Sequence, residues 1–241
     1  MRHLNALPRA DVRNIYRDGV LLMVLFAPVL IILLAKYLVP LAAGLILDRT
    51  GFQLAEHYSL INGFLVLLTP MMFGMITGFL ILEERDEEII TYLSVTPLSR
   101  SGYIAYRLTA PVLASFLVSF LFLGITGLTP FKPLPAMMVA LTVSLEAPIM
   151  ALFLAAFANN KVEGMALSKA FGIMFMAPFA AYFIRSGWQY LAGVFPTFWI
   201  TKSFLAIYRP EENFWLFIAI GLVSHALFIM MLLKRFLRRA T

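Results

Sequence analysis

Two ionisable side chains, Glu146 and His225, stand out because each lies well inside a long apolar run. They lie about ten and eleven residues into their runs, which at about 1.5 Å per helical residue is roughly 15 Å deep, close to the bilayer midplane. Ionisable groups at that depth are costly, and they are usually paired or face a substrate or proton pathway. Glu146 and His225 are therefore predicted either to form a buried pair that fixes helix packing or to contact a substrate or proton.

The other reactive residue types are too scattered for enzymatic chemistry. The histidines are His3, His57 and His225, and no His-Glu-x-x-His sequence occurs, so no zinc site is predicted. The acidic pairs at 83–84 and 87–88 lack the arginine of the Glu-Glu-x-x-x-Arg motif of membrane-embedded proteases, and no Gly-x-Ser-x-Gly sequence is present. Without cysteine, the chain has no thiol nucleophile. We predict no catalytic residue and no metal ligand.

Composition places the chain in the membrane. Apolar residues make up 61% of it and charged residues 13%, against about a quarter charged in soluble domains. The net charge is +6, and the basic residues gather at the ends of the apolar runs. This distribution favours anionic lipid headgroups over nucleic acid as the partner. We predict an all-α integral membrane protein with a single transmembrane domain over residues 1–241.

Six apolar runs are long enough to cross about 30 Å of hydrocarbon as helices. With the N-terminus inside, thirteen Lys and Arg residues fall on the inner side and six on the outer side, as the positive-inside rule requires. Both termini are therefore predicted to be cytosolic. The first run is overlong, so its outer part is expected to tilt or project. The predicted spans are Val20–Leu47, Tyr58–Leu82, Leu108–Leu128, Ala136–Ala158, Ala166–Ile184 and Phe214–Leu233.

Two further segments are predicted to lie at the membrane surfaces. Residues 7–18 fit a helix along the inner interface, with Pro8 in its first turn, although a plain basic leader fits equally well. Residues 186–213 are apolar but interrupted by Pro196, and a crossing here would move the basic C-terminus outside. We interpret 186–213 as a re-entrant hairpin on the outer face, between the fifth and sixth spans.

An acidic segment follows the second span, within a predicted cytosolic loop over residues 83–107. Residues 83–88 hold five of the thirteen acids of the chain, and the apolar residues Ile89, Ile90 and Leu93 form a stripe beside them. Thr96 and Pro97 then end the segment and suit the start of a new helix. A one-sided helix in water beside a membrane is shaped to dock a partner, whereas the simpler alternative is a solvated loop.

Four stretches, in order along nearly the whole chain, resemble the permease subunits of ABC-2 type exporters, in particular drug or fluoroquinolone export permeases. They are the leader at 11–18 with Phe26-Ala27-Pro28, the acidic segment with its continuation Val95 to Tyr103, the loop Asn159 to Gly164, and the hairpin sequence Phe195-Pro196-Thr197-Phe198-Trp199.

The resemblance implies that the first cytosolic loop is a coupling helix, Glu84 to Leu93, seated on a separate ABC ATPase subunit. Lys161 and Glu163 would make a second, smaller contact. No Gly-x-x-x-x-Gly-Lys-Ser/Thr sequence occurs, so ATP and Mg would be bound by the partner and no cofactor by this chain. The predicted partner contacts are Glu84, Glu87, Glu88, Ile89, Ile90, Leu93, Thr96, Pro97, Lys161 and Glu163.

The implied assembly pairs the chain with a second permease copy or a paralogue in the plasma membrane of a prokaryote. The substrate path would lie between the two permeases, and an amphipathic or hydrophobic drug, lipid or peptide would be exported. The alternative is a secondary transporter powered by an ion gradient, which predicts internal repeats and broken helices with charges at the midplane. No convincing repeat is present, and charge at the midplane is sparse.

Overall fold

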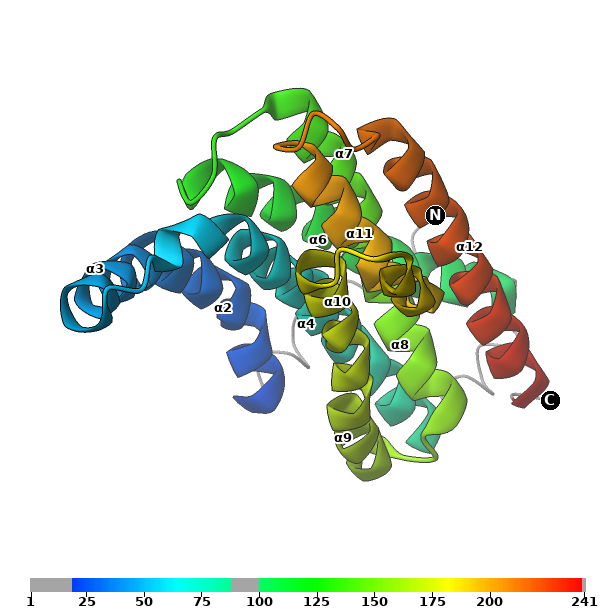
Figure 1. Cartoon of the computed structure of the whole chain (residues 1–241). Helices are drawn as coiled ribbons and strands as arrows, with labels where there is room; N and C mark the ends of the chain where they lie inside the picture. Colours follow the sequence, from blue (N-terminus) through cyan, green and yellow to red (C-terminus); the bar gives the residue numbers. More distant parts are fainter. Residues whose placement is uncertain (1–18, 88–99, 240–241) are drawn as a thin grey trace.

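The computed structural model describes residues 19–87 and 100–239 (Figure 1), so the predicted interfacial helix at 7–18 and most of the predicted coupling segment lie outside it. Within these ranges all regular structure is helical, which confirms the all-α class. Six helical segments are long and apolar enough to cross a membrane, which confirms the predicted number. They are Leu25–Thr50, Leu54–Asp86, Gly102–Ile125, Pro133–Phe157, Lys161–Phe183 and Phe214–Arg238.

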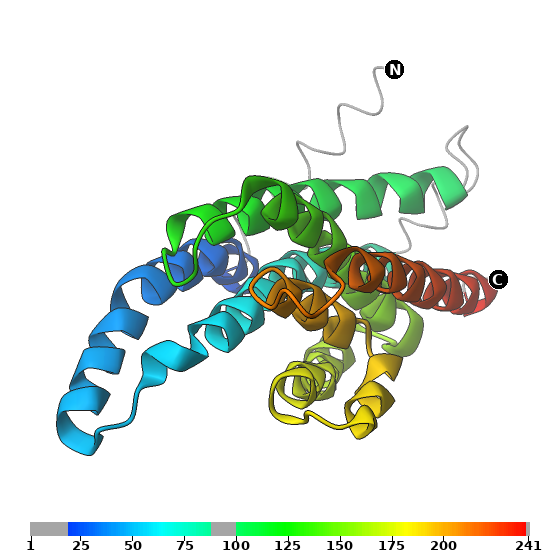
Figure 2. The same ribbon diagram turned by 45° about the horizontal axis from the view of Figure 1, so that its top comes forward.

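The first span is one long, interrupted helix. It consists of α2 (Gly19–Leu33), a π turn η1 (Leu34–Leu38) and α3 (Val39–Thr50). The helix ends at Gly51, whose φ of 72° is easily adopted only without a side chain, and whose N–H donates to the Leu47 carbonyl at 2.9 Å. Figure 2 shows α3 and the 3-10 turn η2 (Leu54–His57) extending away from the remaining helices as a hairpin.

Helix α4 (Tyr58–Asp86) is the central element, and it packs most closely against α8 (Glu146–Phe157). Two glycines one turn apart, Gly74 and Gly78, allow this approach. A Cβ at Gly74 would overlap the carbonyl oxygen of Ala147 and lie 2.8 Å from the Met150 Cβ. Small residues at i and i+4 are what closely packed helices in membranes require, so Gly74 fixes how deeply α4 and α8 interlock.

Replacing Gly74 by alanine is therefore expected to destabilise the protein by about 1–3 kcal/mol, because its neighbour is backbone and cannot move aside easily. Gly44 in α3 is the matched control, since a Cβ there meets nothing within 4 Å. Gly44→Ala is expected to be neutral or slightly stabilising. Thermal unfolding of both variants in detergent measures the difference, and equal melting temperatures would contradict the close-contact explanation.

The third span, α6 (Arg100–Ile125), is continuous, but the fourth is broken. The sequence predicts one helix over Ala136–Ala158, whereas the structure has α7 (Pro133–Ser144) and α8 with a turn at Leu145 between them. Pro148 explains the break, since it has no N–H to donate to the carbonyl of Ser144 and tolerates only the first turn of a helix. Helix α8 consequently begins at Glu146.

The fifth span is also composite. It contains α9 (Lys161–Ala170), the 3-10 segment η3 (Phe171–Met176) and α10 (Ala177–Phe183), and it begins earlier than predicted. The 3-10 segment η4 (Gly187–Val194) and α11 (Pro196–Ala206) then form a helical hairpin before α12 (Phe214–Arg239). Helix α11 is buried along nearly its whole length against α10, α12 and α4. Placement of this hairpin on the outer face stays a prediction.

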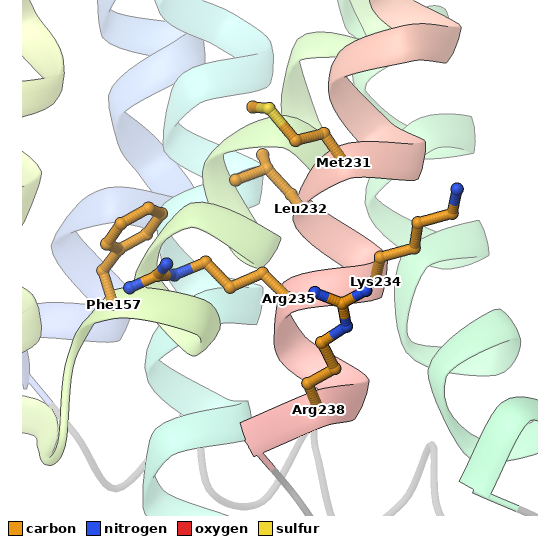
Figure 3. Close-up of a pocket in the computed structure, with 6 residues that line it drawn as sticks. All are labelled: Phe157, Met231, Leu232, Lys234, Arg235 and Arg238. Atoms are coloured by element: carbon orange, nitrogen blue, oxygen red, sulfur yellow. The ribbon is translucent and has the colours of Figure 1, made fainter.

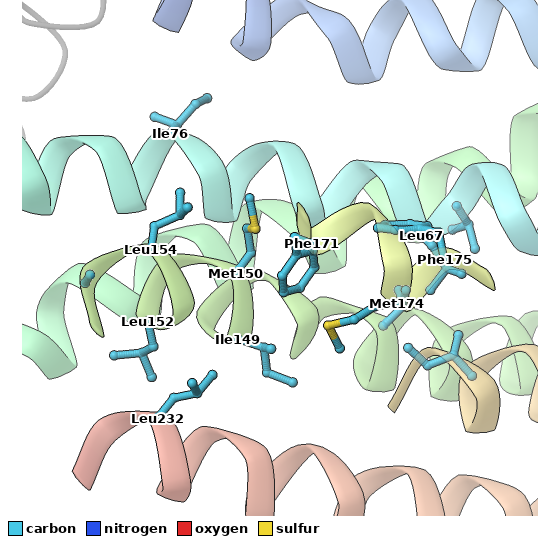
Figure 4. Packing of buried hydrophobic residues seen from close by; sticks show 14 of the residues in the cluster. Leu67, Ile76, Ile149, Met150, Leu152, Leu154, Phe171, Met174, Phe175 and Leu232 are labelled. Atoms are coloured by element: carbon cyan, nitrogen blue, oxygen red, sulfur yellow. The ribbon is translucent and has the colours of Figure 1, made fainter. Parts of the chain in front are cut away.

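The apolar core surrounds α8. Figure 4 shows Ile149, Met150 and Leu152 of α8 lying among α4, η3 and α12, where Phe171 and Leu232 meet them. The spans formed by α4 and by α7 with α8 are mostly buried, whereas the other four present most of their side chains outward. Helix α8 therefore links α4, α6, α9 and α12 in one core.

Candidate functional site

A buried ionic cluster joins the two ends of the predicted coupling loop. Glu84 lies near the end of α4, and Tyr103 and Arg107 lie one turn apart near the start of α6. The Arg107 Nε donates to Glu84 Oε2 at 3.0 Å, its Nη2 donates to Glu84 Oε1, and the Tyr103 hydroxyl donates to Glu84 Oε2. The exposed fractions of Glu84, Tyr103 and Arg107 are 8%, 1% and 5%. One carboxylate thus holds α4 against α6 with a two-pronged guanidinium contact.

Glu84 is buried, although the predicted coupling helix Glu84 to Leu93 was expected to lie in water, and its contact with a partner stays a prediction. Helix α4 continues to Asp86, so Glu84 still belongs to the second span and turns toward α6. Glu87, the next predicted contact, is exposed just after α4. Its own contact with a partner stays a prediction. The remaining predicted contacts of this segment lie outside the described residues, and they are Glu88, Ile89, Ile90, Leu93, Thr96 and Pro97.

Two neighbours of Glu84 tie α4 to further helices. The Arg85 guanidinium donates to the carbonyls of Ala155 and Ala158 at 3.1 and 2.8 Å, which satisfies orphan carbonyls at the C-terminus of α8. The Glu83 carboxylate forms an ion pair with Lys161 of α9, whose Nζ lies 3.4 Å from Glu83 Oε2. The base of the coupling loop therefore connects α4, α6, α8 and α9.

Glu163, the other residue of the predicted second contact, caps α9. Its backbone N–H donates to Asn160 Oδ1 at 2.9 Å, and its carboxylate accepts from the backbone and side chain of Asn159 at 2.7 Å each. This reciprocal arrangement is close to a capping box, and Asn160 followed three residues later by Glu163 is its sequence signal. The structure thus accounts for Lys161 and Glu163 within the chain, while their contact with a partner stays a prediction.

The structure brings Glu146 and His225 together in the interior. His225 Nε2 lies 3.3 Å from Glu146 Oε1, and both side chains are almost completely buried. His225 Nδ1 lies 2.6 Å from the Gly221 carbonyl oxygen. Because a carbonyl oxygen only accepts, Nδ1 must carry a proton and donate it. Glu146 is the first residue of α8, where unpaired backbone N–H groups favour a carboxylate.

The remaining proton of this pair has two possible positions. His225 Nε2 either accepts from a protonated Glu146, or it is protonated and pairs with the Glu146 carboxylate. Both arrangements have zero net charge, which suits an apolar interior better than either ion alone. The 3.3 Å contact is within ion-pair distance, and neither the two Glu146 oxygens nor His225 Nε2 has a hydrogen-bond partner among the described residues. The described part of the chain also contains no cluster of His, Asp and Glu that could bind a metal.

A polar pocket that the sequence interpretation missed lies where α10 and α11 meet the turn before α12. Lys202 of α11 is only 4% exposed, and its Nζ pairs with Glu212 Oε1 at 2.9 Å, which Arg209 Nη1 also reaches at 3.1 Å. The sequence signal was a lysine within the mostly uncharged stretch that forms α11 (Pro196–Ala206). The pocket has a volume of about 320 Å³ and is lined by Ala181, Tyr182, Ile184, Arg185, Gln189, Lys202, Arg209, Glu211 and Glu212.

The turn beside this pocket is fixed to the loop before α7. The Tyr208 hydroxyl donates to the Pro130 carbonyl at 2.9 Å, and Lys132 Nζ donates to the Ile207 carbonyl at 2.8 Å. Burial raises the pKa of Tyr208, so its hydroxyl keeps the proton that it donates. The α11–α12 connection is therefore held in one position relative to α7.

Comparison with known proteins gives a consistent result over nearly the whole chain. The family model described as fluoroquinolones export permease protein Rv2686c-like matches residues 11–233. Two Mycobacterium tuberculosis proteins, fluoroquinolones export permease protein MT2760 of strain CDC 1551 / Oshkosh and fluoroquinolones export permease protein Rv2686c of strain ATCC 25618 / H37Rv, are each 31% identical over 238 residues. The alignment covers 98% of this chain and 94% of each relative. No solved structure gave a significant match.

Proposed function

Because the chain belongs to the Rv2686c-like family of fluoroquinolone export permeases, we propose that it is the membrane-spanning subunit of an ABC-2 type exporter. A separate ATP-hydrolysing subunit docks on the first cytosolic loop and binds the ATP and Mg. The exported substrates are amphipathic or hydrophobic drugs, of the kind that the fluoroquinolones in the relatives' names represent. A second permease copy or a paralogue completes the substrate path.

The observation that carries this proposal is the ionic base under the coupling loop. Glu84 binds Tyr103 and Arg107, so the helices that enter and leave the loop are joined at its two ends. A force on residues 88–99 then displaces α4 and α6 together instead of bending one of them. A rigid connection between the two helices at the base of the loop is what a mechanical role of the loop requires.

The contacts define a route for that movement through the permease. Arg85 passes the displacement of α4 to the C-terminus of α8. At the other end of α8, the break at Leu145 lets this half-helix move separately from α7. Glu146 there contacts His225 and so transfers the movement to α12. ATP hydrolysis at the cytosolic surface is thus converted into rearrangement of α8 against α12 near the middle of the membrane.

One observation favours the alternative of a secondary transporter powered by an ion gradient. The fourth span is broken at Leu145, with Glu146 at the break and His225 beside it, as such transporters often have at their ion sites. Transport by the reconstituted permease alone, driven by a proton gradient and indifferent to ATP, is expected if this alternative holds. Transport that requires an ATPase subunit and survives collapse of the gradient is expected for the ABC-2 assignment.

Leu93→Asp tests the docking surface directly. In the proposed complex the stripe Ile89, Ile90 and Leu93 is buried in the ATPase, and burial of one such side chain contributes roughly 1.5–3 kcal/mol. We therefore expect at least a tenfold loss of affinity, roughly the equivalent of 1.4 kcal/mol, at any ionic strength. The measurement is co-purification of the ATPase, together with drug-stimulated ATP hydrolysis in reconstituted vesicles.

Two companion variants sharpen the result. Leu237→Asp near the end of α12 makes the same chemical change on an exposed side chain that is not part of the loop sequence, and it should retain the partner. Glu87→Lys with Glu88→Lys should weaken association most at low ionic strength, because rim charges are screened by salt. If Leu93→Asp keeps the ATPase and its activity, the segment is a solvated loop and the docking assignment is wrong.

A further inference from the structure

A basic cavity opens beside the C-terminal end of α12, next to the end of α8. It has a volume of about 740 Å³ and is lined by Phe157, Met231, Leu232, Lys234, Arg235 and Arg238. Figure 3 shows the Arg235 side chain extending from α12 toward the Phe157 ring. The positive-inside rule places this end of α12 at the cytosolic surface of the membrane.

The lining of this cavity is divided between cations and apolar groups. Phe157, Met231 and Leu232 form its apolar side, and no carboxylate is among the lining residues in the described part of the chain. The Arg235 guanidinium lies 4.1 Å from the centroid of the Phe157 ring, a cation–π contact that holds the charge at the mouth of the cavity. Such a site attracts an anion that also carries apolar surface.

A second cavity of about 300 Å³ continues from the first into the apolar interior. The two share Phe157, Met231 and Leu232. The second cavity is lined only by apolar side chains, and its α8 wall is the stripe Ile149, Phe153 and Phe157. This stripe is about 12 Å long at 1.5 Å per residue. The length is close to the depth of one leaflet, half of a hydrocarbon core of about 30 Å.

We propose that the two cavities form one binding groove for an anionic phospholipid of the inner leaflet. The lipid phosphate contacts Lys234 and Arg235, and one acyl chain lies along α8 and α12. A free phosphate ion would contact only the basic side chains of the first cavity and would leave the apolar cavity unfilled. A zwitterionic headgroup would bring its own cation beside lysine and arginine side chains. The groove opens sideways to the lipid phase, where Met231 and Ile173 are exposed.

A lipid in this groove would connect the same two helices that the buried pair connects. Glu146 and His225 join α8 to α12 deep in the bundle, and the groove lies between these helices at their cytosolic ends. The lipid is thus expected to stabilise one arrangement of α8 against α12. This inference does not depend on the ATPase assignment.

Native mass spectrometry of the purified full-length protein in mild detergent tests the proposal. The protein is titrated with dioleoyl-phosphatidylglycerol, with dioleoyl-phosphatidylcholine and with inorganic phosphate. We expect phosphatidylglycerol to be retained in preference to phosphatidylcholine. Lys234→Gln with Arg235→Gln should weaken its retention about 25-fold, about fivefold for each charge removed.

Two variants make the test specific to the groove. Arg49→Gln with Lys169→Gln removes the same charge from exposed positions that do not line either cavity, and it should change retention less than twofold. Ala170→Trp fills the apolar cavity from its exposed rim and should also weaken retention of phosphatidylglycerol.

Four results would overturn the proposal. The first is equal retention of the two lipids, and the second is an equal loss in the groove variant and the control variant. The third is displacement of phosphatidylglycerol by inorganic phosphate, which would identify an ion site. In the fourth, the groove variant dissociates a dimer in the same spectra without changing lipid retention, so the groove is covered by a second copy of the chain.

Discussion

Arg107→Met is expected to lower the free energy of unfolding by about 3–5 kcal/mol, because it leaves the buried Glu84 carboxylate without its cation. Arg107 supplies a two-pronged contact to Glu84, and Tyr103 supplies a single hydroxyl donor to the same carboxylate. All three side chains are buried, so water cannot replace the lost guanidinium. Thermal or denaturant unfolding of the purified protein in detergent measures this loss.

The double variant Arg107→Met with Glu84→Gln should recover most of that stability. The glutamine is neutral, and its amide oxygen still accepts from the Tyr103 hydroxyl. Lys169→Met is the control for loss of a cation, and because Lys169 is exposed it should shift stability by less than about 0.5 kcal/mol. A loss of similar size in the control and in Arg107→Met would refute the buried-cluster explanation.

The rescued double variant also separates stability from coupling. It is expected to fold, with a neutral hydrogen bond to Tyr103 in place of the ionic contact between α4 and α6. If the cluster transmits movement from the loop, ATP hydrolysis by the bound partner should continue while drug transport per ATP falls. Unchanged transport per ATP would show that the cluster serves stability alone.

His225→Leu is expected to lower the free energy of unfolding by about 3–5 kcal/mol, because it also leaves a buried carboxylate without its partner. Glu146 would lose its partner in the interior and would have to be protonated or remain an uncompensated charge. Glu146→Met with His225→Leu should restore much of the stability, because two apolar side chains of similar volume leave no buried charge or polar group without a partner. The coupling energy from the double-mutant cycle should exceed the usual additivity limit of about 0.5 kcal/mol.

Glu146→Gln distinguishes a packing role from a role in transport. The glutamine amide is able to donate to a neutral His225 Nε2, so stability should fall by only about 1 kcal/mol. Normal transport by this variant supports a pair that fixes helix packing. Lost transport with nearly unchanged unfolding would place Glu146 in a substrate or proton path. Additive and silent variants would reject both roles.

The six spans were predictable because the physical requirement is strong and local. A helix that crosses the bilayer needs about 20 consecutive apolar residues, and only a few stretches of any chain meet that condition. The break at Leu145 was readable in principle from Pro148, and the close packing of α4 on α8 from Gly74 and Gly78. Each of these signals is a single residue inside a strongly apolar run. The sequence therefore predicted one continuous helix over 136–158, and the break at Leu145 was missed.

The site was less predictable because its contacts join residues far apart in the chain. Glu84 lies in a row of acids, and nothing in that row says that Glu84 turns inward to meet Arg107, 23 residues later. Glu146 and His225 were found through their depth in the membrane, a property that sequence does report. Lys202 was counted only as an outer charge, because the burial of α11 depends on packing against α10, α12 and α4.

The net charge of the Glu146–His225 pair determines how this region responds to the membrane potential. Moving one elementary charge across the membrane changes the free energy by about 2.3 kcal/mol per 100 mV. The pair has zero net charge whichever partner holds the proton, so displacing α8 against α12 carries no net charge through the field. A second proton would change this, because the pair would then become a cation whose movement the voltage opposes or assists. The rearrangement proposed for this region is therefore electrically silent when the pair holds one titratable proton, and voltage-dependent when it holds none, as an anion, or two, as a cation.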